Sequence, residues 1–109
     1  MERKEPITFE YEGKRYVLEF TRNTVLEMER NGFDLSKVGS QLLNATVMLW
    51  NGAFLANHRK TSEKTRNEIF SLMGNKESLF QRLTELYTYA ASSIFDTEGI
   101  EEKNLIKWN

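Results

Sequence analysis

The stretch ITFEYEGKRYVLEF, residues 7–20, decides the fold because apolar and polar side chains alternate along both of its halves. Alternation with a period of two is typical of a β-strand with one buried face. A two-residue turn at Gly13-Lys14, in which glycine supplies a positive φ, would join the two strands. Another loop length would keep the two apolar faces and change the cross-strand pairs. The pairs expected from this turn are Tyr11 with Tyr16, Phe9 with Leu18 and Ile7 with Phe20.

The chain after the hairpin, residues 21–96, offers no further strand pattern and predicts helices. Thr21 can cap a short helix, RNTVLEMERN, whose expected end is Gly32 in a left-handed conformation. In such a Schellman ending, Phe33 would contact Met28. The sequence therefore predicts a first helix whose two ends are both defined by local sequence.

The next predicted helix, from about Ser40 to Asn57, has apolar residues on nearly every side of its helical wheel. Such a helix is usually central and buried. Gly52 within it would weaken the helix by about 1 kcal/mol relative to alanine. The simplest explanation for this glycine is another backbone that passes close to the helix.

Two more helices complete the predicted set. Thr61 or Ser62 can cap the first of them, which ends at Gly74-Asn75. The second runs from about Lys76 to Phe95 and has the clearest helical period. The residues expected to be buried are Ile69, Phe70 and Met73 in the first helix, and Leu79, Leu83, Leu86, Tyr87, Ala90 and Ile94 in the second.

The predicted fold class is α+β, with an N-terminal β-hairpin followed by a bundle of about four α-helices. A chain of 109 residues is long enough for one hydrophobic core and too short for two, which predicts a single domain. Within the domain 1–109 we expect the hairpin at 7–20, the helical part at 21–96 and a C-terminal tail at 97–109.

Composition narrows the classes of partner. Fifteen Lys and Arg against sixteen Asp and Glu leave a net charge of −1, so no general field attracts nucleic acid or an anionic membrane. The absence of cysteine excludes disulfides and thiolate chemistry. The start MERKEP lacks the apolar core of a signal peptide, and the longest apolar-rich run is too short to span a bilayer. We expect a cytoplasmic protein with no nucleic-acid or membrane partner.

The residue types that catalysis requires form no recognisable set. His58 is the only histidine, so a multi-histidine metal site is impossible, and a helix-capping or solvent-exposed role is favoured over a catalytic one. The basic run HRKTSEKTR, residues 58–66, is interpreted as a solvated loop and helix start in preference to a phosphate-binding stripe. We therefore expect no enzyme activity, cofactor, metal or small-molecule substrate.

Binding of another protein is the class of function that remains. A two-stranded sheet has two outer edges, and their unpaired backbone groups can accept another strand. The apolar face of the hairpin is more simply covered by the helices of the same chain. The tail is too apolar to be dismissed as a solvated end, although it could instead dock on its own core. The candidate protein-binding residues are Thr8, Glu10, Val17 and Glu19 on the hairpin, and Leu105, Ile106 and Trp108 in the tail.

Three segments carry a resemblance to a known family: ITFEYEGKRYVLEFTRNTVLEMERNGFD, MLWNGAFLANHRKTSEKTRNEIF and ESLFQRLTELYTYA. The most suggestive parts are the hairpin that leads into Thr21-Arg22, the MERNGF run, and the W-x-G-A-F-L-x-x-H run at residues 50–58. Across residues 7–95 the chain resembles the small tail assembly chaperones of long-tailed bacteriophages and prophages, especially those of Gram-positive hosts. It departs from them at Arg59, where similar proteins often have proline.

The resemblance implies a non-enzymatic protein that coats the tape measure protein and helps the tail tube to polymerise around it. Its expected partners are the tape measure protein, the tail tube protein and other copies of itself. Its expected location is the cytoplasm of the bacterial host, with no place in the mature virion. The alternative functions are a structural tail or head-tail connector protein, and a small prophage-encoded regulator that binds a host protein.

Overall fold

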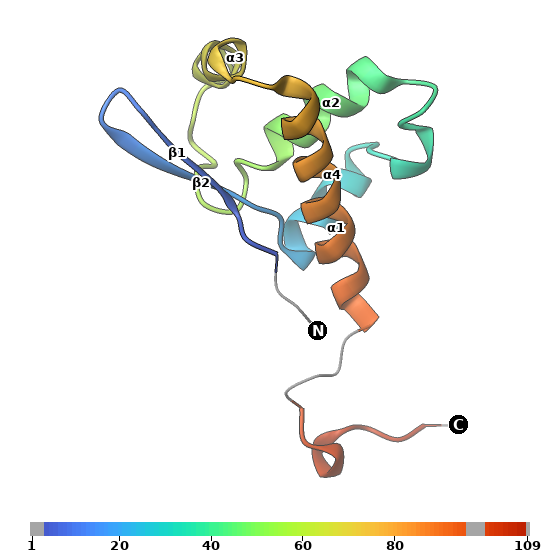
Figure 1. Cartoon of the computed structure of the whole chain (residues 1–109). Coiled ribbons are helices and arrows are strands. Elements are labelled where there is room, and N and C mark those ends of the chain that lie inside the picture. The colour runs from blue at the N-terminus through green and yellow to red at the C-terminus, as the bar shows by residue number, and fades with distance from the viewer. Residues whose placement is uncertain (1–3, 96–99, 109) are drawn as a thin grey trace.

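The computed structural model describes residues 4–95 and 100–108 (Figure 1). It begins with an antiparallel hairpin, followed by four α-helices within the described residues, so the predicted α+β class is confirmed. The elements are β1 (Ile7–Tyr11), β2 (Lys14–Leu18), α1 (Arg22–Arg30), α2 (Leu42–Gly52), α3 (Glu63–Leu72) and α4 (Lys76–Ser92). Short 3-10 helices occupy Leu35–Lys37, Ser93–Phe95 and Glu102–Asn104.

The turn of the hairpin lies one residue earlier than the sequence predicted. Glu12 (φ 50°) and Gly13 (φ 79°) both have positive φ, as a type I′ turn requires. This turn matches the twist of the two strands, and the two apolar faces survive because moving the turn by one residue shifts every pair by two. The predicted pairs were therefore wrong. The observed pairs on the apolar face are Tyr11 with Lys14, Phe9 with Tyr16 and Ile7 with Leu18.

The apolar face of the hairpin packs against α2 and the loop that follows it. The ring of Tyr16 stacks on that of Phe9, with 5.3 Å between centroids, and meets the ring of Phe54 edge-on at 6.1 Å. Phe9 also stacks on Trp50 at 6.5 Å, and Leu18 is fully buried. The helical part of the chain thus covers this face, as the sequence suggested.

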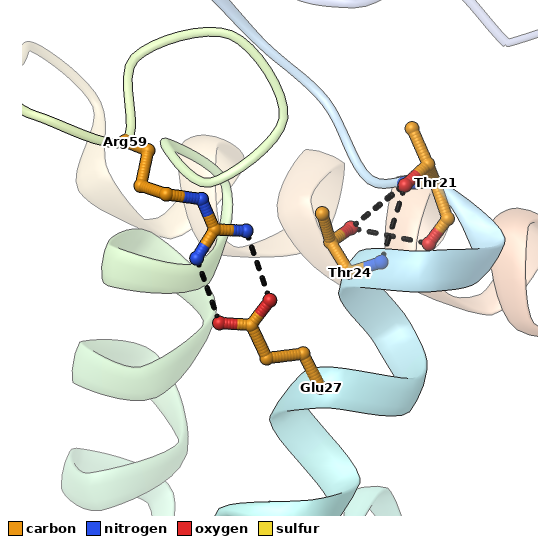
Figure 2. Close-up of polar contacts among 4 residues, drawn as sticks. All are labelled: Thr21, Thr24, Glu27 and Arg59. Carbon is orange, nitrogen blue, oxygen red and sulfur yellow. Dashed lines mark hydrogen bonds and ion pairs between the residues drawn. The ribbon is translucent and has the colours of Figure 1, made fainter.

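Both ends of α1 form as predicted. The Thr21 hydroxyl accepts a hydrogen bond from the Thr24 N–H (3.1 Å), and the Thr24 hydroxyl accepts one from the Thr21 N–H (2.8 Å), which is a capping box (Figure 2). At the other end Gly32 has φ 100°, and the Phe33 N–H donates to the carbonyl of Met28 (3.0 Å). This is the Schellman geometry, which turns the chain sharply away from α1.

α2 is shorter and less buried than predicted. Leu42, Leu43 and Val47 are 56%, 79% and 48% exposed, whereas Ala45 and Leu49 are buried. The apolar residues lie on all sides of this helix, so the helical wheel alone does not reveal which side the rest of the chain covers. The expectation of a buried helix was therefore wrong for the side of α2 that carries Leu42, Leu43 and Val47.

Gly52, the last residue of α2, lies against a side chain and not against a passing backbone. A Cβ added at Gly52 would overlap the Sδ and Cε atoms of Met28 on α1. The expected close backbone was therefore wrong, and the close approach of α1 and α2 is made by this methionine. Its thioether occupies the space that a side chain at position 52 would need.

α4 supplies the middle of the core. Leu83 is fully buried, and the ring of Tyr87 meets those of Phe20 (5.4 Å) and Phe33 (4.9 Å) edge-on. On α3, which Ser62 caps, Ile69 is buried. The predicted buried residues Leu79, Leu83, Leu86, Tyr87 and Ala90 are all buried, Phe70 and Met73 are half-buried, and the side chain of Ile94 lies outside the described residues.

Candidate functional site

The outer edge of β2 is hydrogen-bonded to the loop that follows α2. The Val17 N–H donates to Nε2 of His58 (2.9 Å), and the Val17 carbonyl accepts from Nδ2 of Asn57 (3.1 Å). The Glu19 N–H donates to the carbonyl of Ala53 (3.3 Å). The expectation that this edge is unpaired was therefore wrong, because the loop takes the place that an added strand would occupy. A role of Val17 and Glu19 in protein binding stays a prediction and requires the loop to move.

The outer edge of β1 is different. Val17 points its N–H and carbonyl away from β1, so its cross-strand partner Thr8 points its own N–H and carbonyl away from β2, on the opposite edge. Glu10, two residues further along β1, points its backbone groups the same way. Within residues 4–95 and 100–108, no hydrogen bond reaches the backbone of Thr8 or Glu10. The Arg82 guanidinium donates to the carbonyl of Glu5 (3.0 Å), just before the strand begins. β1 thus keeps an open edge of the kind that accepts another strand.

His58 joins the loop to the hairpin, a contact that its position in the sequence did not suggest. Its Nε2 accepts a hydrogen bond, so this nitrogen carries no proton and the ring is neutral. Burial, and then the charge of Lys14, lower the pKa of His58 below its ordinary value, which favours the same neutral form. The ring also lies 5.0 Å from that of Tyr16. The sequence favoured a helix-capping or exposed role for His58, whereas in the structure His58 is a neutral hydrogen-bond acceptor at the edge of β2.

The basic run at residues 58–66 makes contacts within the chain. Arg59 forms two hydrogen bonds of 2.9 Å with the carboxylate of Glu27, which ties the loop after α2 to α1 (Figure 2). The hydrogen bond from Arg59 is the main reason that the pKa of Glu27 is lowered. Arg66 donates to the Asn51 side chain (2.7 Å) and to the Thr61 carbonyl (2.5 Å). These contacts favour a structural role for the run over a phosphate-binding stripe.

Exposed large apolar side chains gather in two places, whereas Leu72 on α3 and Phe95 after α4 are exposed singly. The first is the α2 patch, which consists of Leu42, Leu43 and Val47. The second is the tail, where Ile106 is 90% and Trp108 is 89% exposed, and where Leu105 is half-buried. In Figure 1, residues 100–108 lie away from helices α1 to α4. Both places offer apolar surface that the described residues leave uncovered.

The described part of the chain forms neither a metal site nor a membrane span. No three or more His, Asp or Glu side chains there gather in a way that could hold a metal ion. None of the helices described is long and apolar enough to cross a membrane. The features that stand out on the described residues are the β1 edge, the α2 patch and the tail.

Comparisons with known proteins give a family but no related protein of stated activity. Neither the curated proteins nor the solved structures contain a match to this chain. A family model does match, over residues 1–109, and its description is a domain of unknown function, DUF5055. The chain therefore belongs to the DUF5055 family.

Proposed function

We propose that this protein is a tail assembly chaperone, which binds the tape measure protein of a long-tailed phage or prophage and assists assembly of the tail tube without catalysis. The proposal rests on the resemblance of residues 7–95 to such chaperones. The observation that carries it furthest is the exposure of large apolar side chains on the α2 patch and in the tail. Contiguous exposed apolar surface usually marks a site of protein–protein contact.

The small size of the exposed apolar surface suits reversible binding. Fully burying an exposed large apolar side chain contributes about 1.5–3 kcal/mol, so the three residues of the α2 patch, which are 48–79% exposed, supply about 3–6 kcal/mol. Association itself costs about 4–15 kcal/mol, which leaves one copy with weak affinity for one segment of the client. Many copies bound along a long client coat it through repeated weak contacts, and each copy can still dissociate by itself. A chaperone that the growing tail tube displaces requires such contacts.

Co-expression with a tape measure protein from the same genome tests the proposal. We expect the chaperone to keep the tape measure protein soluble and to co-purify with it. The double variant Leu43→Gln, Val47→Gln removes apolar surface from the α2 patch and should reduce co-purification. Leu72→Gln is the matched control, because Leu72 is 70% exposed but lies on α3, away from the patch. A tape measure protein that stays insoluble and does not co-purify with the wild type contradicts the proposal.

Mass spectrometry of purified particles separates this function from the structural alternatives. A chaperone acts in the host cytoplasm and is absent from the finished virion, whereas a tail or connector protein is present in many copies. Particles that contain the chain in stoichiometric amounts would exclude the chaperone role. A pull-down that returns one host protein and no phage protein would favour a regulator instead.

A further inference from the structure

A cavity of about 210 Å³ lies between α1, α2 and the loop that follows α2. We call it the α1–α2 cavity. Its apolar lining includes two methionines, whose flexible side chains adapt to differently shaped partners. Arginines stand beside this apolar lining. The lining of the cavity includes Met28, Met48, Gly52, Phe54, Arg59 and Arg66.

The two arginines of the α1–α2 cavity differ in how their charges are balanced. Arg59 is neutralised by Glu27, as Figure 2 shows. Arg66 is half-buried, and its partners are the neutral oxygens of Asn51 and Thr61, which engage Nε and Nη1. Within the part of the chain that the structure describes, no salt bridge reaches Arg66 and no acceptor engages its Nη2. Arg66 therefore keeps both charge and donors for an anionic group from outside.

The size of the α1–α2 cavity indicates what kind of group enters it. Pockets for small molecules usually measure about 300–1,000 Å³, so 210 Å³ suits one or two apolar side chains better. A second hollow, of about 70 Å³, shares Met48 and continues along α2 past Asn44. Asn44 and Gly52 line opposite ends of this line of hollows and lie about 12 Å apart along the helix. That length matches two turns of a partner helix.

We infer that the α1–α2 cavity binds an amphipathic helix of the client, with an apolar side chain among Met28, Met48 and Phe54 and a Glu or Asp carboxylate on Arg66. The charge of Arg66 and its Nη2, which no acceptor in the described residues engages, favour an acidic partner, and the line of hollows favours an elongated one, which together fit a helix laid in a groove. The inference rests on the proposed function in one respect, since it adds to the α2 patch a second surface on which the chaperone holds its client.

Fluorescence anisotropy with two designed peptides tests the inference. Both are amphipathic helices of about five turns with leucine at helical spacing, and they differ in one residue beside the apolar stripe, Glu in one and Gln in the other. We expect the wild-type protein to bind the Glu peptide about tenfold more tightly, because a charge-assisted hydrogen bond is stronger than a neutral one. Absence of binding, or equal affinity for the two peptides, would overturn the inference.

Variants of Arg66 assign the preference to this side chain. Arg66→Gln should bind both peptides equally, whereas Lys64→Gln, which removes the same charge from α3 outside the cavity, should keep the preference. Because Arg66 also holds Asn51 and Thr61, a loss of fold could imitate a loss of binding. Arg66→Glu controls for this, since it should recover affinity for a third peptide that carries Lys at the variable position. Failure of this exchange would also overturn the inference.

Two further results separate this inference from its alternatives. If the tape measure protein co-purifies equally well with Arg66→Gln, the proposed function stands and this site is wrong. If the Glu peptide binds through Arg66 but the tape measure protein does not bind at all, the site stands and the proposed function is wrong. Sedimentation tests a third possibility, in which the wild type is a dimer. If Arg66→Gln and removal of residues 100–109 each dissociate that dimer, the cavity binds the tail of a second copy. This result would overturn the client site.

Discussion

Replacing His58 with alanine is expected to loosen the hairpin from the rest of the fold. The imidazole Nε2 is the acceptor for the Val17 N–H at 2.9 Å, and alanine provides no acceptor in its place. The same change removes the ring that lies 5.0 Å from Tyr16. Two contacts between segments far apart in the chain are therefore lost together.

The size of the effect follows from the burial of the two groups. A hydrogen bond contributes about 0.5–1.5 kcal/mol, and a buried donor left without a partner costs about 1–3 kcal/mol. Val17 is only half-buried, so water can reach its N–H in part and the lower values apply. Loss of the ring contact adds about 0.5 kcal/mol. We expect His58→Ala to lower the free energy of unfolding by about 1–2 kcal/mol, which shifts the Tm down by about 4–10 °C.

The pKa of His58 adds a dependence on pH. Because burial and Lys14 lower this pKa in the folded protein, the unfolded chain, with its ordinary value of 6.5, takes up the proton first as pH falls. The free energy of unfolding contributed by His58 is therefore complete above pH 6.5 and declines as pH falls from there through the folded-state pKa. Glu27 and Asp34 have lowered pKa values and lose their contributions only below their ordinary values of 4.5 and 3.8.

Urea unfolding followed by circular dichroism, at pH values of about 7 and about 5.5, measures both effects. Wild type should lose stability between these pH values, and His58→Ala should be weaker at pH 7 but change less. His58→Gln is the matched control, since its amide oxygen can accept the Val17 N–H and does not titrate. Equal urea midpoints for wild type and His58→Ala at pH 7 would refute a stabilising Val17–His58 bond. An identical loss of stability in both proteins between the two pH values would refute the titration of His58.

Three other substitutions test the fold through the same urea titration. Leu83→Ala should cost about 2–5 kcal/mol because Leu83 is fully buried, and a loss below about 1 kcal/mol would place it outside the core. Gly32→Ala should cost about 1–2 kcal/mol because Gly32 has φ 100°, whereas Gly39→Ala, at a glycine without positive φ and with open space around it, should cost much less. Equal effects of these two changes would contradict the Schellman ending. Thr21→Ala should cost about 1 kcal/mol through loss of the helix cap, and no change in the urea midpoint would show that the capping box contributes nothing.

Local features of the fold were predictable because each depends on a few neighbouring residues. Thr21 and Gly32 define the two ends of α1 through contacts within the same short segment. The apolar period of α4 selects its buried face, since polar residues mark the opposite side. The position of the hairpin turn was less determined, because Glu12-Gly13 and Gly13-Lys14 both preserve the alternation. The choice between them depends on a positive φ at Glu12, which alternation does not encode.

The features that matter for contact were harder to predict because they depend on residues far apart in the chain. Val17 and His58 are 41 positions apart, and the only signal is a polar Asn57-His58 pair after a long apolar run. The exposure of Leu43 could not be predicted, because α2 has apolar residues on all sides and its sequence does not mark which side faces solvent. Arg66 lies in a run whose charges look alike, and only its surroundings distinguish it from Lys64. The exposed Ile106 and Trp108 of the tail were identified from the sequence as candidate binding residues, and their binding stays a prediction.

The loop that closes the β2 edge also has a consequence for the order of folding. The hairpin leaves the ribosome before Ala53, Asn57 and His58, which supply the bonds at its outer edge. A lone two-stranded hairpin is barely stable in water, so the nascent hairpin should remain unprotected until those residues have been synthesised and α2 has formed. In native-state hydrogen exchange, the Val17 amide should accordingly stay protected until the loop after α2 releases it. The amides of Thr8 and Glu10, on the open edge, should exchange far sooner.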